Sequence, residues 1–238
     1  MSLQLRNISI GYGKDKAVFE HITCTAEPKS LIVLIGVNGI GKSTLLRTIS
    51  GLQPAISGSI LIDTKPLQTL SASERAKYLS LVLTERLVLD SMAVEEFIAL
   101  GRAPYTNWLG QLSKVDKNEI NDIIQLLKIE KLQYKQFNKI SDGEKQKVLI
   151  ARALCQQANI LILDEPTAFL DYRNKKEIIA LLAQIAANLN KVIILSTHDI
   201  EAALEQATAC WIMAEDGKFK VINKSTDFKQ QVLATLNT

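Results

Sequence analysis

The chain has 238 residues, a length that allows one large domain with a full hydrophobic core. Hydrophobic residues make up 47% of the sequence and charged residues 22%, as in ordinary globular proteins. The net charge of +3 is too small to indicate a nucleic-acid-binding protein, because such proteins usually carry a clustered basic face. The apolar runs LIVLI and ILIL are far shorter than the roughly 20 residues of a membrane-spanning helix, so we expect no span.

The N-terminal sequence and the cysteines both favour a reducing compartment. The first residues, MSLQLRNISIGYG, contain no apolar core of signal-peptide length. Cys24, Cys155 and Cys210 are far apart, odd in number and form no CxxC pair. We therefore expect three reduced, buried thiols, as in a cytosolic protein.

The first third of the chain reads as strands around one helix. Leu3, Leu5, Ile8 and Ile10 alternate with polar neighbours, which predicts a half-buried strand before a turn at 11–16. The further elements expected here are an apolar strand at 30–36, a helix at 42–50 closed by Gly51, a strand at 57–63, and a short helix leading into a strand over 73–83.

The character of the sequence changes between about residues 92 and 138, where no strand signal appears. Two segments, 92–102 and 114–132, have helical patterns. Ser113 followed by Asp116 is typical of a helix start. This part therefore reads as a helical insertion between two α/β halves. The apolar residues that repeat on one face of its second helix are Ile120, Ile123, Ile124 and Leu127.

The last hundred residues alternate between helices and strands, which predicts an α/β fold with a mostly parallel sheet. The last dozen residues are weakly patterned. The elements expected in this part are a helix at 144–157, a strand at 160–163, a helix at 173–188, a strand at 192–195, a helix at 199–208, a strand at 210–214 and a hairpin at 215–222.

The segment GVNGIGKS fits the pattern G-x-x-x-x-G-K-[ST] of a phosphate-binding loop, with an apolar strand before it and a helix after it. Its glycines let successive backbone amides face a polyphosphate, and the helix start adds its dipole. Lys42 is expected to reach the β and γ phosphates of ATP, and Ser43 to ligate Mg²⁺. The residues expected to bind nucleotide are Gly36, Val37, Asn38, Gly39, Ile40, Gly41, Lys42, Ser43 and Thr44.

The segment ILILDEPT is an apolar strand that ends in two acids. Asp164 follows the strand at its carboxyl end, where ligands collect in open α/β sheets. We expect Asp164 to hold Mg²⁺ through water, and Glu165 to polarise the water that attacks the γ-phosphate.

Five motifs occur in the order found in ATP-binding cassette (ABC) ATPases: GVNGIGKS, ISDGEKQK, ILILDEPT, AFLD and STHD. The resemblance covers about residues 2 to 222. It implies an α/β fold of the P-loop NTPase class, with an N-terminal antiparallel β part. The core would comprise residues 1–86 and 139–238, with a helical subdomain at 87–138. Lys42, Glu165 and His198 would be the catalytic residues, with ATP and Mg²⁺ as cofactors.

The turn at residues 140–144 resembles the signature motif of that family, usually written LSGGQ. In the family, this turn caps the γ-phosphate of ATP bound to the opposite subunit. Ser141 and the amide of Gly143 can donate hydrogen bonds there, at a helix start. The resemblance thus implies a head-to-tail dimer with a second copy of the chain.

Three other positions carry roles that the resemblance implies. Tyr12 resembles the aromatic residue that stacks on adenine. Asp171, in AFLD, resembles the loop that couples the two sites across the dimer. His198, in STHD, resembles the histidine that contacts the γ-phosphate.

The sequence departs from the family pattern in two places. Asp142 and Glu144 stand where Gly and Gln are usual, and two acids beside a triphosphate would repel it. We therefore expect these acids to point away from the phosphates or to meet the nearby lysines, Lys145 and Lys147.

The second departure is a missing glutamine near residue 84, where the family contacts Mg²⁺ and senses the membrane partner. The chain has LVLTER at 81–86, so Thr84 or, with a shift of one residue, Glu85 takes that position as a magnesium ligand.

The segment EEFIALGRAPYTNWLGQLSKVDK at 95–117 resembles importer ATPases for iron–siderophore complexes, haem and cobalamin. In those systems, the segment contacts the cytoplasmic loops of a permease. Phe97, Tyr105 and Trp108 would suit a groove for a partner helix, although a subdomain core would use at least Phe97.

The expected protein is the ATP-hydrolysing subunit of such an importer, peripheral to the cytoplasmic face of the membrane. Its partners would be a second copy of itself, an integral membrane permease and, indirectly, a periplasmic or surface binding protein, with no nucleic acid. The alternative is a soluble ABC ATPase acting on ribosomes or DNA. Such proteins usually carry two cassettes, a long coiled coil or zinc ligands, and the sequence has none of these.

Overall fold

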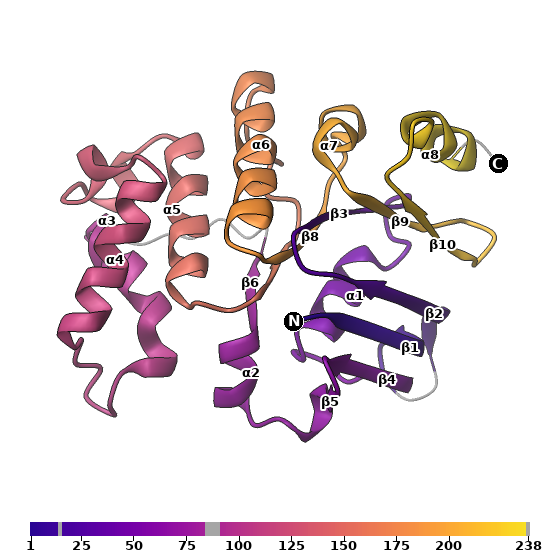
Figure 1. The fold of residues 1–238 in the computed structure, drawn as a ribbon, viewed down its shortest axis with the longest axis horizontal. Coiled ribbons are helices and arrows are strands. Elements are labelled where there is room, and N and C mark those ends of the chain that lie inside the picture. Colours follow the sequence, from indigo (N-terminus) through magenta and orange to yellow (C-terminus); the bar gives the residue numbers. More distant parts are fainter. Residues whose placement is uncertain (14–15, 84–90, 237–238) are drawn as a thin grey trace.

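The computed structural model describes residues 1–13, 16–83 and 91–236. It has an antiparallel sheet at one end, a larger sheet in the middle and a group of helices at the other end (Figure 1). The strands are β1 (Leu3–Gly11), β2 (Ala17–Ala26), β3 (Ser30–Ile35), β4 (Ser57–Ile62), β5 (Lys65–Pro66), β6 (Leu79–Val82), β7 (Ile160–Leu163), β8 (Val192–Ser196), β9 (Ala209–Met213) and β10 (Phe219–Asn223). The α-helices are α1 (Lys42–Ile49), α2 (Ala72–Tyr78), α3 (Val94–Ala99), α4 (Lys114–Leu126), α5 (Asp142–Cys155), α6 (Tyr172–Asn188), α7 (Ile200–Gln206) and α8 (Phe228–Leu236).

The central sheet has six strands in the order β10-β9-β3-β8-β7-β6, and all neighbours except β10 and β9 are parallel. Strands β3, β7 and β8 are buried at every position and almost wholly apolar, because both faces of the sheet are covered. Leu31 and Val33 face the core under the helices, whereas Ile32 and Leu34 face the core under the antiparallel sheet. The expected α/β fold with a mostly parallel sheet is confirmed.

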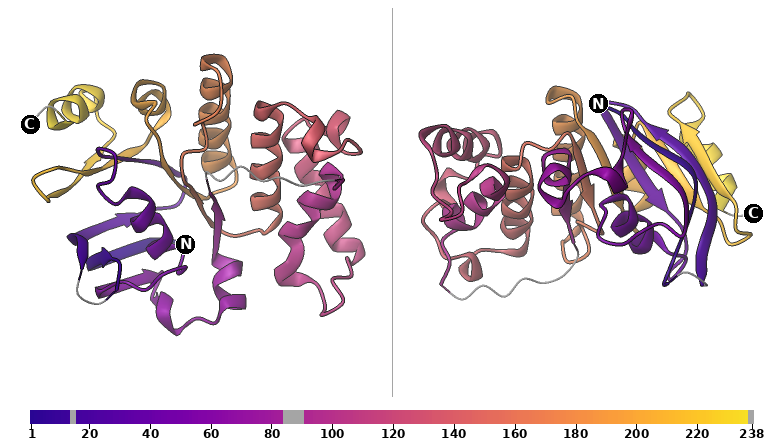
Figure 2. Two further views of the ribbon diagram at one scale, coloured as in Figure 1. Left: turned by 180° about the vertical axis from the view of Figure 1, so that it is seen from behind. Right: turned by 90° about the horizontal axis from the view of Figure 1, so that it is seen from below.

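The second sheet is antiparallel, in the order β2-β1-β4-β5, and packs with α1 over the other face of the central sheet (Figure 2). Leu3, Leu5, Ile8 and Ile10 are all buried in this layer, as their alternation predicts. Strand β2 was absent from the expected elements, although its residues alternate between buried and exposed positions over much of its length.

Helices α3 and α4 pack on α5 at the end of the molecule away from the antiparallel sheet (Figures 1 and 2). The rings of Phe97 and Phe137 meet there, with centroids 4.8 Å apart. The apolar residues of α3 and α4 join the same core cluster as those of α5, α6 and the central sheet. The helical part is therefore fastened to the core through α5.

The second helix of the insertion is shorter than predicted, because it ends at Leu126 instead of continuing to 132. Lys128 adopts a left-handed conformation, with φ of 56°. The amide of Ile129 then donates to the carbonyl of Ile124, closing the helix in the manner of a glycine-ended helix. A lysine at this position gives no sequence signal for the stop.

The C-terminal residues form a helix that the sequence pattern did not predict. Phe228 and Val232 are buried one turn apart and anchor α8 to the core. The hairpin of β9 and β10 is confirmed, with Gly217 in the left-handed region at its turn. Within the described residues, no helix is both long and apolar enough to cross a bilayer.

Candidate nucleotide site

The phosphate-binding loop connects β3, in the middle of the central sheet, to α1. Gly41 has a φ of 113°, so it supplies a left-handed turn that other residues rarely adopt. A side chain at Gly36 would lie 2.8 Å from the carbonyl oxygen of Met213, on the neighbouring strand β9. The loop can follow this backbone path because Gly36 and Gly41 carry no side chains. Such a path lets backbone amides surround a phosphate.

Lys42 lies within this loop and is only 7% exposed. Its Nζ donates to the carbonyl oxygens of Gly36 at 2.7 Å and Val37 at 3.1 Å. Burial lowers the pKa of Lys42, while the negative charges of Glu165 and Asp164 act in the opposite direction. The lysine therefore shares one electrostatic environment with both acids, which follow a different strand.

Asp164 and Glu165 follow β7, and the next strand along the sheet, β8, ends in Ser196. Because parallel strands place their carboxyl ends at one edge, the loop and the acids meet there. The hydroxyl of Ser196 donates to Oδ1 of Asp164 at 2.6 Å and accepts from the amide of Glu165 at 2.9 Å. Asp164 is 5% exposed, so this bond holds a buried carboxylate in place.

Glu165 and His198 form a pair, with Oε1 and Nε2 2.6 Å apart. The backbone of Glu165 has a φ of 49°, an uncommon conformation for a residue with a side chain. Such strain is found at functional sites, where the surroundings hold the residue in place. The amide bond to Ser196 is one of the contacts that hold it.

A second layer of polar contacts supports the loops that carry these residues. The hydroxyl of Thr167 donates to Asp199 at 3.0 Å, and the hydroxyl oxygens of Thr167 and Thr197 are 3.3 Å apart. Lys175, on α6, donates to the same Asp199 carboxylate at 2.9 Å. Sequence reasoning missed these roles and that of Ser196. The one signal available was the position of Ser196 and Thr197 in the STHD segment directly after an apolar strand.

Tyr12 lies at the side of the loop, after β1. Its hydroxyl oxygen is 3.2 Å from the hydroxyl oxygen of Thr44, in the first turn of α1, and the residue is 67% exposed. The ring is thus anchored beside the phosphate loop while part of its surface is open to solvent.

The signature-like turn begins α5, with Ser141 as the N-cap. Ser141 and Glu144 form a capping box, in which the serine hydroxyl and amide both donate to the Glu144 carboxylate. These bonds lower the pKa of Glu144, the backbone amide of Ser141 contributing most. Asp142 pairs with Lys145 at 3.3 Å, one of the arrangements expected for this acid. Glu144 pairs with Ser141 instead, and forms no ion pair with a lysine among the described residues. Lys147 instead pairs with Glu177.

Asp171 caps α6 and lies close to the signature turn through one neighbour, Asn174. Both carboxylate oxygens of Asp171 accept hydrogen bonds from Asn174, at 2.9 and 2.7 Å. A side chain at Gly143 would meet Asn174 at 3.2 Å. The starts of α5 and α6 are therefore packed against each other.

Helices α5 and α1 lie apart along the long axis of the molecule, with α6 between them in the view of Figure 1. The signature turn and the phosphate loop of one chain thus belong to different parts of its surface. The structure brings together Lys42, Asp164, Glu165 and His198, and leaves Ser141 and Gly143 with the helical part. The expected magnesium ligands Thr84 and Glu85 lie outside the described residues.

The residues present fit a nucleotide with a divalent cation. The glycine-shaped loop offers space and backbone amides to phosphates, and Asp164 offers a carboxylate beside it. Within the described ranges, no group of three or more His, Cys, Asp or Glu residues could hold a metal alone. A cation such as Mg²⁺ would therefore take part of its oxygen ligands from the phosphates, as is usual for this ion.

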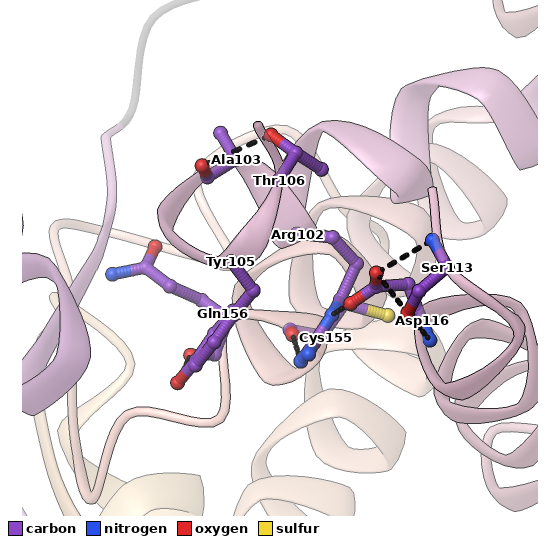
Figure 3. Close-up of polar contacts among 8 residues, drawn as sticks. All are labelled: Arg102, Ala103, Tyr105, Thr106, Ser113, Asp116, Cys155 and Gln156. Carbon is purple, nitrogen blue, oxygen red and sulfur yellow. Dashed lines mark hydrogen bonds and ion pairs between the residues drawn. The ribbon is translucent and has the colours of Figure 1, made fainter. Parts of the chain in front are cut away.

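The segment that resembles importer ATPases makes buried contacts within the chain (Figure 3). We call the contacts of Arg102 with Asp116 and Cys155 the clasp. Arg102 is buried and donates to Asp116 and to the carbonyl oxygen of Cys155, both at 2.8 Å. Its guanidinium lies over the ring of Tyr105, 4.0 Å from the centroid. Phe97 is 3% exposed and belongs to the core, so only Tyr105 and the 91% exposed Trp108 remain from the expected aromatic groove.

Comparison with known proteins shows that the chain is similar to ATP-binding proteins of transporters. The family model described as ABC transporter matches residues 19–168. The chain is 40% identical to an uncharacterized ABC transporter ATP-binding protein of Methanocaldococcus jannaschii, over 86% of this chain and 70% of that protein. It is 29% identical to an iron(3+)-hydroxamate import ATP-binding protein of Bacillus subtilis, over 85% of this chain and 75% of that protein.

A solved structure shows the same fold. A bacterial ABC transporter cassette solved as a dimer superimposes with a TM-score of 0.77, at 22% identity, over 93% of this chain and 98% of that one.

The three cysteines are free and buried, as expected from the sequence.

Proposed function

This chain belongs to the ATP-binding cassette (ABC) transporter family, and from that premise we propose that it is the ATP-hydrolysing subunit of an importer for metal-chelate cargo of the iron–siderophore, haem or cobalamin type. The observation that carries the hydrolytic part is the Glu165–His198 pair at 2.6 Å, beside the loop that contains Lys42. Catalysis of phosphoryl transfer needs positioning and neutralised charge, and these residues supply both.

The phosphate loop binds the triphosphate of ATP. The backbone amides between Gly36 and Thr44 face the phosphate oxygens, and Lys42 leaves its two carbonyl partners to contact the β and γ phosphates. Ser43 and Asp164 would hold Mg²⁺, which would supply positive charge to the phosphates, and Thr84 or Glu85 would be the candidate for a further oxygen ligand. Tyr12 stacks on the adenine.

Glu165 accepts a proton from the attacking water as general base. His198 orients the Glu165 carboxylate through their short contact and reaches the γ-phosphate from the end of β8. Ser196 positions both acids, because it bonds the side chain of Asp164 and the backbone of Glu165.

Two chains close head to tail on two ATP molecules. Ser141 and the amide of Gly143 cap the γ-phosphate bound to the other chain, and Asp171 couples the two sites. The separation of α5 and α1 within one chain supports this assignment, since α5, which the signature turn begins, lies away from the helix that follows the phosphate loop of the same chain (Figure 1). The solved dimeric cassette supports it at the level of the fold.

The importer assignment rests on the named relatives. One of them is an iron(3+)-hydroxamate import protein, and a Bacillus subtilis protein 32% identical over 87% of this chain and 74% of that protein is described as a probable siderophore transport system ATP-binding protein. The chain then sits on the cytoplasmic face of a membrane permease, with a periplasmic or surface binding protein delivering the cargo. The alternative, a soluble ABC ATPase acting on ribosomes or DNA, is not favoured, because these relatives are transport subunits.

The variant Glu165→Gln tests the hydrolytic assignment. It keeps the shape of the side chain but cannot accept the proton, so we expect turnover to fall by about 10²- to 10⁴-fold. ATP binding should persist, and the ATP-bound dimer should accumulate in size-exclusion chromatography. Glu130→Gln, on the surface of the helical part, is the matched control. Turnover within twofold of the unaltered chain would refute the role of Glu165.

A further inference from the structure

The contact between Glu165 and His198 joins two side chains that solvent reaches, since they are 22% and 51% exposed. A charged contact in such a place gains little free energy, because water screens it and both side chains must give up rotamer freedom. A contact of 2.6 Å therefore needs the two loops that carry these residues to be held together by other bonds. Those bonds come from residues next to Glu165 and His198 in the chain.

A ring of hydrogen bonds joins the two loops. Thr167 follows Glu165 by two residues, Thr197 directly precedes His198, and both threonines are buried. The Thr167 hydroxyl donates to Oδ2 of Asp199 at 3.0 Å, and the amide of Asp199 donates to the Thr197 hydroxyl at 3.0 Å. Because a hydroxyl has one proton to donate, Thr197 donates to Thr167 across the remaining 3.3 Å. The ring thus holds the residues on both sides of His198 to the loop of Glu165.

The second oxygen of the Asp199 carboxylate is held from a different element. Lys175, on α6, donates to Oδ1 of Asp199 at 2.9 Å, and both side chains are partly buried. The backbone amide of Lys175 donates to the carbonyl oxygen of Asp171, the N-cap of α6, so the ammonium group is carried by the start of a helix. Lys175 therefore connects α6 to the turn that carries His198.

The next residue on α6 has the same charge but a different direction. A helix turns by about 100° per residue, so neighbouring side chains point to different sides. Lys176 pairs with Glu205, on α7, at 3.8 Å and lies over the ring of Tyr172, 5.0 Å from the centroid. Lys176 is thus a matched control for the charge of Lys175.

We propose that Lys175 is a positioning residue for ATP hydrolysis: it fixes the Asp199 carboxylate, and the Asp199 turn fixes His198 against Glu165. The inference rests on the proposed function for the reaction that this pair serves. Without the ammonium group, Oδ1 of Asp199 loses its partner and the turn can move away from the loop of Glu165. The turnover number depends on this contact, whereas nucleotide affinity depends on the phosphate loop.

Turnover measured as phosphate release tests this role. Lys175→Met keeps the length of the side chain and removes its charge, so kcat should fall about tenfold. The affinity for a fluorescent ATP analogue should stay within about threefold. Lys175→Arg should bring kcat back to within about threefold, because a guanidinium also pairs with a carboxylate. Lys176→Met should stay within about twofold of the unaltered chain.

A double variant tests whether Lys175 acts through Asp199. In the background of Asp199→Asn, Lys175→Met should lower kcat by less than about twofold more, because both changes remove the same interaction. Losses that multiply in full would overturn the route through Asp199. Equal losses of kcat and ATP affinity in Lys175→Met would show that Lys175 acts only on the fold.

A spectroscopic measurement reports on His198 without turnover. The chain has two histidines, so His21→Asn leaves His198 as the one source of imidazole signals. In this background and without nucleotide, Lys175→Met should shift the ring nitrogen resonances of His198 toward those of Glu165→Ala, in which the contact is broken. Lys175→Arg and Lys176→Met should leave them in place.

The two kinds of measurement separate this inference from the proposed function. Ring resonances in Lys175→Met that match those of the unaltered chain would overturn the positioning of His198, whatever the turnover. An unaltered chain that hydrolyses no ATP, with His198 resonances that respond as expected, would overturn the proposed hydrolysis and leave the link from Lys175 to His198 supported.

Discussion

At the scale of single residues, the site depends on the neutral side chain of Ser196. Ser196 donates to Asp164 and accepts from the amide of Glu165, so it fixes the carboxylate expected at the metal and the backbone of the expected base. These two bonds cross between neighbouring strands. We therefore expect a serine in this place to position the proposed catalytic groups without touching the reacting atoms.

Replacing Ser196 with alanine should lower kcat about 10- to 100-fold, since a hydrogen bond to a charged group contributes about 1.5–3 kcal/mol. The affinity for a fluorescent ATP analogue should stay within about threefold, because the phosphate loop is unaltered. Phosphate release and equilibrium binding measure the two quantities. Ser59→Ala, on β4, is the control, and equal losses of kcat and binding would show a structural role only.

At the scale of elements, α5 is fixed at both ends by polar contacts. The capping box of Ser141 and Glu144 begins it, and Arg102 bonds the carbonyl oxygen of Cys155 at its end. Arg102 is itself held by Asp116, whose side chain caps α4 together with Ser113. The clasp thus fastens the end of one helix to the start of another.

Replacing Arg102 with methionine should lower the free energy of unfolding by about 3–5 kcal/mol, because it leaves the Asp116 carboxylate buried without its partner. Urea denaturation measures the change. The matched control is Arg152→Met, an arginine of the same region without a described counter-charge, which should cost far less. A loss for Arg102→Met as small as for the control would contradict the importance of the ion pair.

The same clasp predicts a pH dependence. The pKa of Asp116 is lowered, first by the Ser113 hydroxyl and also by Arg102. A carboxyl group with a lowered pKa contributes stability above its unfolded pKa, and this stability is lost as the pH falls through the folded value. The difference between the unaltered chain and Asp116→Asn should therefore shrink in urea titrations as the pH falls below about 4, the ordinary pKa of an aspartate in an unfolded chain.

At the scale of the whole molecule, we propose that the phosphate loop of one chain and the signature turn of a second chain serve the same nucleotide, because α5 and α1 lie apart along the long axis (Figure 1). Mixing Ser141→Arg and Lys42→Ala chains tests this arrangement. Neither variant should hydrolyse ATP alone, but their mixed dimer pairs an intact loop with an intact turn at one of two sites. We expect activity to appear on mixing, measured as phosphate release. Full activity of Ser141→Arg alone would show that the turn is not required.

Much of the fold was predictable because its signals are local. The strand-loop-helix of the phosphate site, the capping box of α4 and the periodicity of the insertion each lie within a few residues of one another. Strand β2 and helix α8 were not predicted, and α4 was predicted too long, because a left-handed Lys128 gives no sequence signal. Secondary structure that depends on burial of a few side chains, as in α8, is decided by packing.

The sequence by itself determined the type of site: a phosphate loop, two acids after a strand and a histidine after the next strand, in a fixed order. Only the tertiary structure decided which atoms meet. The Glu165–His198 contact, the two bonds of Ser196 and the pairing of Arg102 with Asp116 join residues from different elements. Among the described residues, it also left Nε of Arg152 without a hydrogen-bond partner, since such partners are assigned by the folded geometry and not by spacing along the chain.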